Sequence, residues 1–133
     1  AWNSMLLNLP QKRLVLLQEL KKSFRLFLLS NTNEIHIDFF EKKMQEAGQL
    51  ETYYNCFEKI YYSSRIKMRK PDKECFKYVL KESQLKAKET LFIDDSIQHI
   101  ISAKELGINT HHLQENENLN TIFPGIIQSK PHS

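Results

Sequence analysis

Three short runs of consecutive apolar residues limit the possible folds of this sequence more than any other feature. The runs cover residues 26–29, 60–62 and 91–93. Runs this short, without alternation of apolar and polar positions, are typical of strands that are buried on both faces of a parallel sheet. A further strand is expected over residues 108–113. The sequence therefore predicts a sheet whose strands lie in the interior of the protein.

Segments with helical spacing of apolar residues separate these strands. They cover residues 11–22, 35–47, the stretch that follows Pro71, and residues 97–106. Successive runs begin about thirty residues apart, which leaves room for a helical crossover between parallel strands. At 133 residues the chain can form one compact core. We therefore predict an α/β fold with a doubly wound parallel sheet.

Charge and cysteine usage argue against several classes of partner and location. The net charge of +3 is small, and the lysines are spread along helices without a cluster of aromatic residues, so we expect no nucleic-acid partner. Cys56 and Cys75 fit no metal-ligand spacing, and the sequence has neither a secretory signal nor a long apolar run. We expect free thiols, a cytoplasmic location and no membrane partner.

Polar residues follow the predicted strands, at the carboxyl ends where doubly wound folds bind ligands. Ser30 and Asn31 follow the first run, and a hydroxyl with backbone N–H groups at the start of a helix can hold phosphate oxygens. Lys70, in the loop after the second run, would supply a positive charge to the same oxygens. Asp94 and Asp95 follow the third run, and two adjacent carboxylates repel each other unless a cation offsets their charge. Mg²⁺ is a hard cation that suits such carboxylates together with water and phosphate oxygens.

Taken in this order, the three segments resemble motifs of a known family. The segments are Leu28-Leu29-Ser30-Asn31-Thr32, Met68-Arg69-Lys70-Pro71-Asp72 and Leu91-Phe92-Ile93-Asp94-Asp95-Ser96. They resemble the second, third and fourth motifs of the haloacid dehalogenase-like hydrolases. The resemblance covers roughly residues 5–113, and three motifs in the family's order are more specific than any one of them.

The resemblance implies a Mg²⁺-dependent phosphatase that acts on a small phosphorylated metabolite through an aspartyl-phosphate. On the family's pattern, Asp95 would bind the metal directly and Asp94 would help through its water shell. Ser30 and the Asn31 amide would hold the phosphate, while Lys70 would pair with the nucleophile and with the charge that develops during transfer. Ser30 and Lys70 are thus the catalytic candidates. Dehalogenation and phosphate transfer to a sugar stay open as other activities of the same family.

Two features depart from the family's pattern. His99 stands where the family usually has Asn, and no Asp-x-Asp motif is recognisable, because the sequence before Ser30 contains Glu19 as its only acidic residue. We therefore expect the first strand to be missing from the middle of the sheet and the chain alone to be inactive. A second chain or an N-terminal segment would complete the sheet. The opening residues resemble the middle of a helix, which predicts the end of a helical cap and its return helix over 1–23 and the α/β core over 24–133.

A noncatalytic interaction protein with the same fold is the main alternative, either as a degenerate family member or as a domain that completes its sheet with another chain. Binding of Mg²⁺ separates the two, since an enzyme core requires the metal and a scaffold does not. A receiver domain also combines an acidic pair, a hydroxyl and a Lys-Pro on a parallel sheet. There the acidic pair comes first, whereas in this sequence it comes last.

Overall fold

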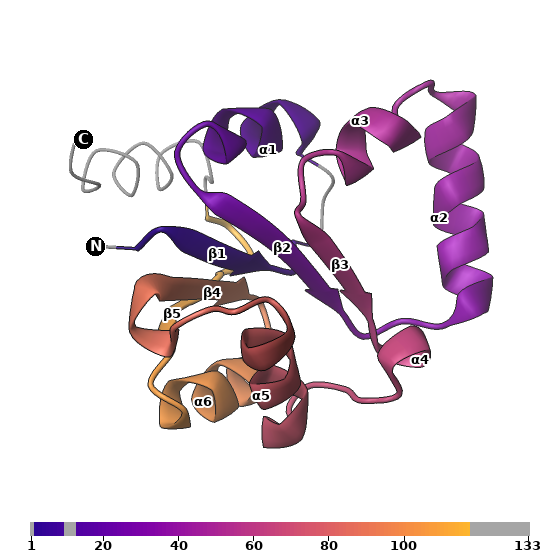
Figure 1. Ribbon diagram of the computed structural model, residues 1–133. Coiled ribbons are helices and arrows are strands. Elements are labelled where there is room, and N and C mark those ends of the chain that lie inside the picture. The colour runs from indigo at the N-terminus through magenta and orange to yellow at the C-terminus, as the bar shows by residue number, and fades with distance from the viewer. Residues whose placement is uncertain (1, 10–12, 118–133) are drawn as a thin grey trace.

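The computed structural model describes residues 2–9 and 13–117. They form one parallel five-stranded sheet, in the order β3-β2-β1-β4-β5, with helices on both faces (Figure 1). The strands are β1 (Ser4–Leu7), β2 (Arg25–Ser30), β3 (Lys59–Tyr62), β4 (Thr90–Asp94) and β5 (Asn109–His112). The predicted doubly wound α/β architecture is confirmed.

The helices form two layers. They are α1 (Leu14–Lys21), α2 (Glu34–Glu46), α3 (Leu50–Tyr54), α4 (Ser63–Ile66), α5 (Lys73–Glu82), α6 (Ile97–Glu105) and the 3-10 helix η1 (Ala87–Glu89). In Figure 1, α1, α2 and α3 lie on one side of the sheet, and α5 and α6 lie on the other. The sequence does not predict α3, α4 and η1, because helices of five residues or fewer are too short to show an apolar period.

Burial on both faces explains the continuous apolar runs. In β2, Leu26 and Leu28 pack with the α1–α3 layer, and Phe27 and Leu29 pack with the α5–α6 layer. All four side chains are at most 6% exposed, so no position in this strand favours a polar residue until Ser30. The same alternation places Ile93 toward the first layer and Phe92 toward the second.

The first strand differs from the sequence-based expectation. Residues 4–7 form β1, which pairs with β2 on one side and β4 on the other, although the sequence favours a helix here and an empty central position. Met5 and Leu6 are fully buried. A short apolar run does not distinguish a strand from a buried helix, and here the pairing on both sides decides. The helical interpretation is thus wrong for these four residues, and the described sheet has no gap; the division into 1–23 and 24–133 stays a prediction.

The strand order reverses its direction at the central strand β1. From β1 the chain proceeds to β2 and β3 on one side, and it then continues with β4 and β5 on the other side of β1. Parallel sheets bind ligands beyond the carboxyl ends of the strands at this kind of reversal. Among the described residues, no helix is long and apolar enough to cross a membrane.

Candidate functional site

Lys70 joins the carboxyl ends of β2 and β4. Its ammonium donates a hydrogen bond of 2.9 Å to the backbone oxygen of Leu29 and one of 2.7 Å to Oδ2 of Asp94. Leu29 directly precedes Ser30, so the ammonium contacts the residue next to the predicted phosphate-binding serine. Both charged side chains of the ion pair are fully buried. The structure thus brings together two of the predicted site residues in direct contact.

Asp94 accepts hydrogen bonds on both carboxylate oxygens. Besides Lys70, the backbone N–H of Ser96 donates to Oδ1 at 2.8 Å, and Nδ1 of His99 lies 3.1 Å from Oδ2. His99 therefore supports the acidic residue at the position where the family usually has Asn. Burial of a carboxylate is costly unless such partners surround it, so this cluster holds Asp94 in one orientation.

Burial and the charge of the partner together shift the pKa values of Lys70 and Asp94. Burial lowers the pKa of Lys70, and the nearby charge and hydrogen bond of Asp94 offset part of that shift. Burial would raise the pKa of Asp94, but the charge of Lys70 and its hydrogen bond outweigh this effect, so the pKa of Asp94 lies below its usual value. Burial therefore opposes the charged form of both groups, and the contact between them favours it.

Asp95 has a different environment from its neighbour. Its side chain is exposed, and its backbone oxygen accepts a hydrogen bond of 3.0 Å from Nε2 of His112. Partial burial and the adjacent carboxyl group of Asp94 raise the pKa of Asp95. A cation beside Asp95 would remove this unfavourable interaction. The carboxylate of Asp95 is therefore chemically suited to a cation, whereas that of Asp94 is already surrounded by donors.

The described residues contain no group of three or more His, Cys, Asp or Glu side chains that could hold a metal ion by themselves. This donor set fits a metal that takes few protein ligands. Mg²⁺ usually keeps several waters and binds one or two carboxylates together with phosphate oxygens. Asp95, with Asp94 next to it, meets that requirement for Mg²⁺ and not the requirement of a site made wholly of protein ligands.

Asn31 holds the Lys70 loop in place. Its side-chain amide donates to the backbone oxygen of Lys70 at 2.8 Å, and its Oδ1 accepts from the backbone N–H of Lys70 at 3.0 Å. The Asn31 side chain is thus occupied by protein, which leaves its backbone amide for the predicted role toward phosphate. The half-buried hydroxyl of Ser30 has no hydrogen-bond partner in the part of the chain that the structure describes.

Two supporting residues were not among the sequence-based candidates. Ser63 accepts a hydrogen bond of 2.9 Å from the backbone N–H of Thr32 and donates one of 3.0 Å to the backbone oxygen of the same residue. His99 contacts Asp94, as described above. Ser63 directly follows β3, and this position at a strand end is the signal that could have identified it.

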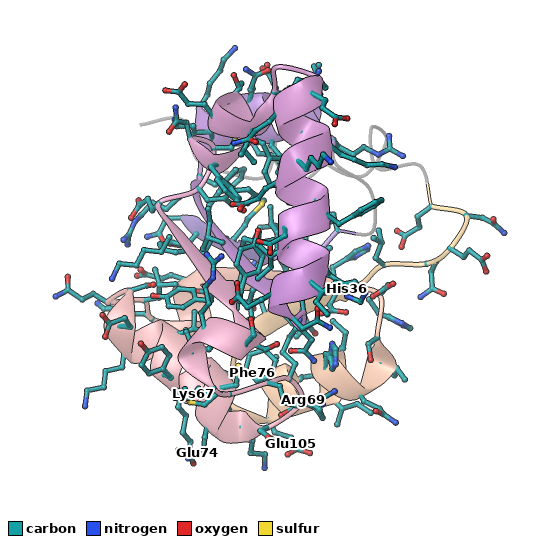
Figure 2. The ribbon with its side chains drawn as sticks, turned by 90° about the vertical axis from the view of Figure 1, so that its right-hand side faces the viewer. His36, Lys67, Arg69, Glu74, Phe76 and Glu105 are labelled. Atoms are coloured by element: carbon teal, nitrogen blue, oxygen red, sulfur yellow. The ribbon has the colours of Figure 1, made fainter. Side chains whose placement is uncertain are left out.

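A pocket opens beside Ser30, on the side of the sheet that α2 and α3 cover. Its volume is about 220 Å³. We name it the strand-end pocket, and the residues that line it are Asn8, Leu9, Leu28, Ser30, Thr32, His36, Ile37, Phe40, Tyr53 and Tyr62. His36 lies at the start of α2, at the end of the helix that is nearer α4 (Figure 2). Ser30, one of the phosphate-binding candidates, is therefore part of the pocket lining.

The residue after the central strand is Asn8. Its backbone N–H donates a hydrogen bond of 3.2 Å to the oxygen of Ile93, so it lies beside the end of β4. A side-chain amide is not a nucleophile for phosphoryl transfer. In the family, the Asp-x-Asp motif follows the first strand. In this chain, Asn8-Leu9-Pro10 follow the central strand β1.

Two further cations lie close to the site in sequence. Lys67 and Arg69 are exposed in the loop between α4 and α5 that leads to Lys70 (Figure 2). Exposed cations near a binding edge raise the local concentration of anions. The loop thus favours a negatively charged ligand.

Comparison with known proteins identifies the same family. Residues 11–113 match the family model of the haloacid dehalogenase-like hydrolases. The match begins after β1. A D-ribitol-5-phosphate phosphatase from Bacteroides thetaiotaomicron is 33% identical over 112 residues, which cover 83% of this chain and 53% of that protein.

Solved structures agree with this result. A HAD family enzyme from Bacteroides thetaiotaomicron, in complex with magnesium and inorganic phosphate, matches with a TM-score of 0.75 at 38% identity, over 88% of this chain and 59% of that one. A HAD-like hydrolase from Porphyromonas gingivalis matches with a TM-score of 0.79 at 28% identity, over 92% of this chain and 60% of that one. The chain thus spans between half and two thirds of the length of these relatives.

Proposed function

Because this chain belongs to the haloacid dehalogenase-like hydrolases, we propose that it forms the part of a phosphatase that holds a small phosphorylated metabolite together with Mg²⁺. The observation that carries the proposal is the buried contact of 2.7 Å between Lys70 and Asp94 at the strand ends. Removing both charges from water costs free energy of desolvation. Buried ion pairs of this kind are typical of functional sites.

Each residue has a role in the proposed site. The Ser30 hydroxyl and the Asn31 backbone amide bind phosphate oxygens, and the Lys70 ammonium stabilises the charge that develops during transfer. Asn31 and Asp94 position Lys70 through its backbone and its side chain, respectively. His99 in turn orients Asp94.

Asp95 would bind Mg²⁺ directly, and Asp94, whose carboxylate is fully buried against Lys70, would contribute its negative charge next to Asp95. When bound, the cation supplies positive charge to the phosphate oxygens. The raised pKa of Asp95, which results from burial and from the adjacent Asp94, supports this assignment, because the positive charge of a cation would offset both effects.

The chain alone lacks a nucleophile. No Asp precedes Ser30 in the sequence, and Asn8 follows the central strand. We infer that the aspartyl-phosphate of the family's mechanism would need a carboxylate from outside these 133 residues. This chain should therefore bind phosphate and Mg²⁺ without turning over a phosphate ester.

Two measurements test the proposal. Calorimetry with MgCl₂ and inorganic phosphate should detect binding to the chain, and Asp95→Asn should weaken Mg²⁺ binding by at least about tenfold. Asp38→Asn is the matched control, since Asp38 is exposed on α2 and should leave binding unchanged. Equal Mg²⁺ affinity of the chain and of Asp95→Asn would contradict the metal assignment. Mg²⁺-dependent hydrolysis of p-nitrophenyl phosphate by the chain would contradict its predicted inactivity.

A noncatalytic interaction protein is the second candidate, and the observation that favours it is the continuous sheet in which β1 fills the central position and ends at Asn8. Such a protein needs no metal, so the absence of Mg²⁺ binding in the same titration would support it.

A cytoplasmic location stays part of the proposal, supported by Cys56 and Cys75, which are both free thiols.

A further inference from the structure

The strand-end pocket has a composition that none of the roles above uses. Six of its ten lining residues are apolar or aromatic: Leu9, Leu28, Ile37, Phe40, Tyr53 and Tyr62. None of the lining residues is Asp, Glu, Lys or Arg, and His36 is the one imidazole among them. The pocket thus offers no fixed charge to a ligand group. A charged group would lose its hydration there without compensation, whereas an apolar group would lose little.

The aromatic side chains of the pocket contact one another and their neighbours. Phe40 and Tyr53 contact each other edge to face, with ring centroids 5.3 Å apart. The hydroxyl of Tyr62 is hydrogen-bonded to that of Tyr54 at 2.8 Å, and Tyr54 donates to Glu41 at 2.8 Å. Because its hydroxyl is engaged there, Tyr62 contributes mainly its ring to the pocket. A preformed aromatic wall favours binding of flat or branched apolar groups at low entropic cost.

The position of the pocket relates it to the proposed phosphate site. Ser30 belongs to the lining, and the chain continues from Ser30 to Asn31, which contacts Lys70. A ligand whose phosphate lies against Ser30 can therefore place the rest of its structure in the pocket. The volume of about 220 Å³ accommodates about seven groups of the size of a water molecule, at about 30 Å³ each. This volume suits a small ring or a short branched chain.

We infer that the strand-end pocket binds the uncharged, apolar part of a compact phosphate monoester, and that the chain prefers such esters to phosphorylated polyols. This inference rests on the proposed function, since Ser30 is shared by the two sites. Asn8, Thr32 and His36 offer hydrogen-bond groups to a polyol, but a hydroxyl group that lies against one of the six apolar or aromatic residues has no partner, which costs binding free energy.

Nuclear magnetic resonance titrations of the chain in MgCl₂ test the preference with four probes: phenyl phosphate, glycerol 3-phosphate, inorganic phosphate and phenol. We expect phenyl phosphate to bind at least tenfold more tightly than glycerol 3-phosphate and inorganic phosphate, with shifts of the Ile37 methyl and Phe40 ring signals. Equal affinities for the three phosphates would overturn the inference and leave the proposed function standing.

Two variants of α2 locate the binding. His36→Trp should fill the mouth of the pocket and reduce the affinity for phenyl phosphate to that for inorganic phosphate, which should itself bind as before. The variant keeps the helix start, because the hydrogen bond to Asn33 uses the backbone N–H of His36. Asp38→Trp adds the same ring to an exposed position of the same helix outside the pocket lining and should change neither affinity. An unchanged affinity of His36→Trp for phenyl phosphate would also overturn the inference.

Phenol separates this inference from the proposed function. If no phosphate binds but phenol shifts the signals of Ile37 and Phe40, and His36→Trp abolishes these shifts, the pocket is an apolar binding site and the proposed function fails. If neither phenol nor phenyl phosphate shifts these signals, the inference fails whatever the result with inorganic phosphate.

Discussion

The two ends of the sheet hold ion pairs of similar length and opposite character. At the amino end, Arg25 contacts Glu58 at 2.8 Å, and the two side chains are 43% and 48% exposed. At the carboxyl end, Lys70 contacts Asp94 at 2.7 Å, and both side chains are fully buried. Water solvates the first pair in the folded and the unfolded protein, whereas the second pair loses its hydration on folding. A short contact alone thus says little about function, and the loss of solvent is what distinguishes the site.

The largest difference between the pairs should appear when one partner is removed. Asp94→Ala leaves the buried ammonium of Lys70 without a counter-charge, which should lower the free energy of unfolding by about 3–5 kcal/mol. Urea denaturation measures this loss. The double variant Lys70→Met with Asp94→Leu removes both charges and should recover most of the stability. A double variant as unstable as Asp94→Ala would show that packing, and not the unpaired charge, causes the loss.

Mg²⁺ should stabilise the protein by binding at the carboxyl end of the sheet and not at the amino end. At a concentration about one hundred times the dissociation constant, a bound ligand raises the free energy of unfolding by about 2.7 kcal/mol. Asp95→Asn should remove this gain, and Glu58→Gln should retain it, because Glu58 lies at the other end of the sheet. Thermal denaturation with and without MgCl₂ provides the comparison. The same gain in Asp95→Asn would place the cation elsewhere.

Acid titration should separate the two adjacent carboxyl groups. Without Mg²⁺, Asp95 should protonate first as the pH falls, because burial and Asp94 raise its pKa. Asp94 should protonate later, because the charge and hydrogen bond of Lys70 outweigh burial and lower its pKa. Asp94 therefore stabilises the fold above its unfolded pKa of about 3.9 and loses this contribution as the pH falls through its folded value. For Asp95 the sign is reversed, since a raised pKa favours the folded state at low pH.

Carbon NMR of the carboxyl groups measures this order, and salt sharpens the comparison. The hydrogen bond from Arg25 lowers the pKa of Glu58 against a smaller effect of burial. In about 1 M NaCl the pKa of Glu58 should move toward its usual value, because salt screens exposed charges, while that of Asp94 should stay low. A reversed order of Asp94 and Asp95 would contradict the electrostatic account of the site.

The smallest effect should come from the exposed pair itself. Glu58→Gln removes the charge but keeps a side chain of similar shape, and it should lower the free energy of unfolding by at most about 1 kcal/mol. High salt should abolish even this difference. A loss as large as that of Asp94→Ala, measured in the same urea series, would remove the distinction between the two ends.

The sequence predicts most of the fold because strands that are buried on both faces consist of consecutive apolar residues. The runs at 26–29 and 91–93 became β2 and β4, and the helical periods became α1, α2, α5 and α6. β1 could not be predicted in the same way. Its four residues would be equally apolar in a buried helix, and its identity depends on partners that are distant in the sequence, such as Leu91 beside Met5.

The candidate site, too, could be predicted from the sequence only in part. Lys70 and the Asp94-Asp95 pair could be identified because they follow strands, but the contact of Lys70 with Asp94, rather than Asp95, depends on the direction in which each side chain leaves its strand. The two hydrogen bonds of Asn31 to the Lys70 backbone connect positions 39 residues apart, and no local pattern predicts them. The pocket beside Ser30 likewise requires five separate segments to meet.

The central position of β1 has a consequence for how the protein forms. β1 and β2 are synthesised before β4, so Ser4 can align with Arg25 before Leu91 has been made. The opposite edge of β1 must wait for β4, since Met5 pairs with Leu91. Until then that edge exposes backbone groups that invite pairing with other chains. Nascent chains of this protein should therefore need chaperones most during the interval between the emergence of β2 and that of β4.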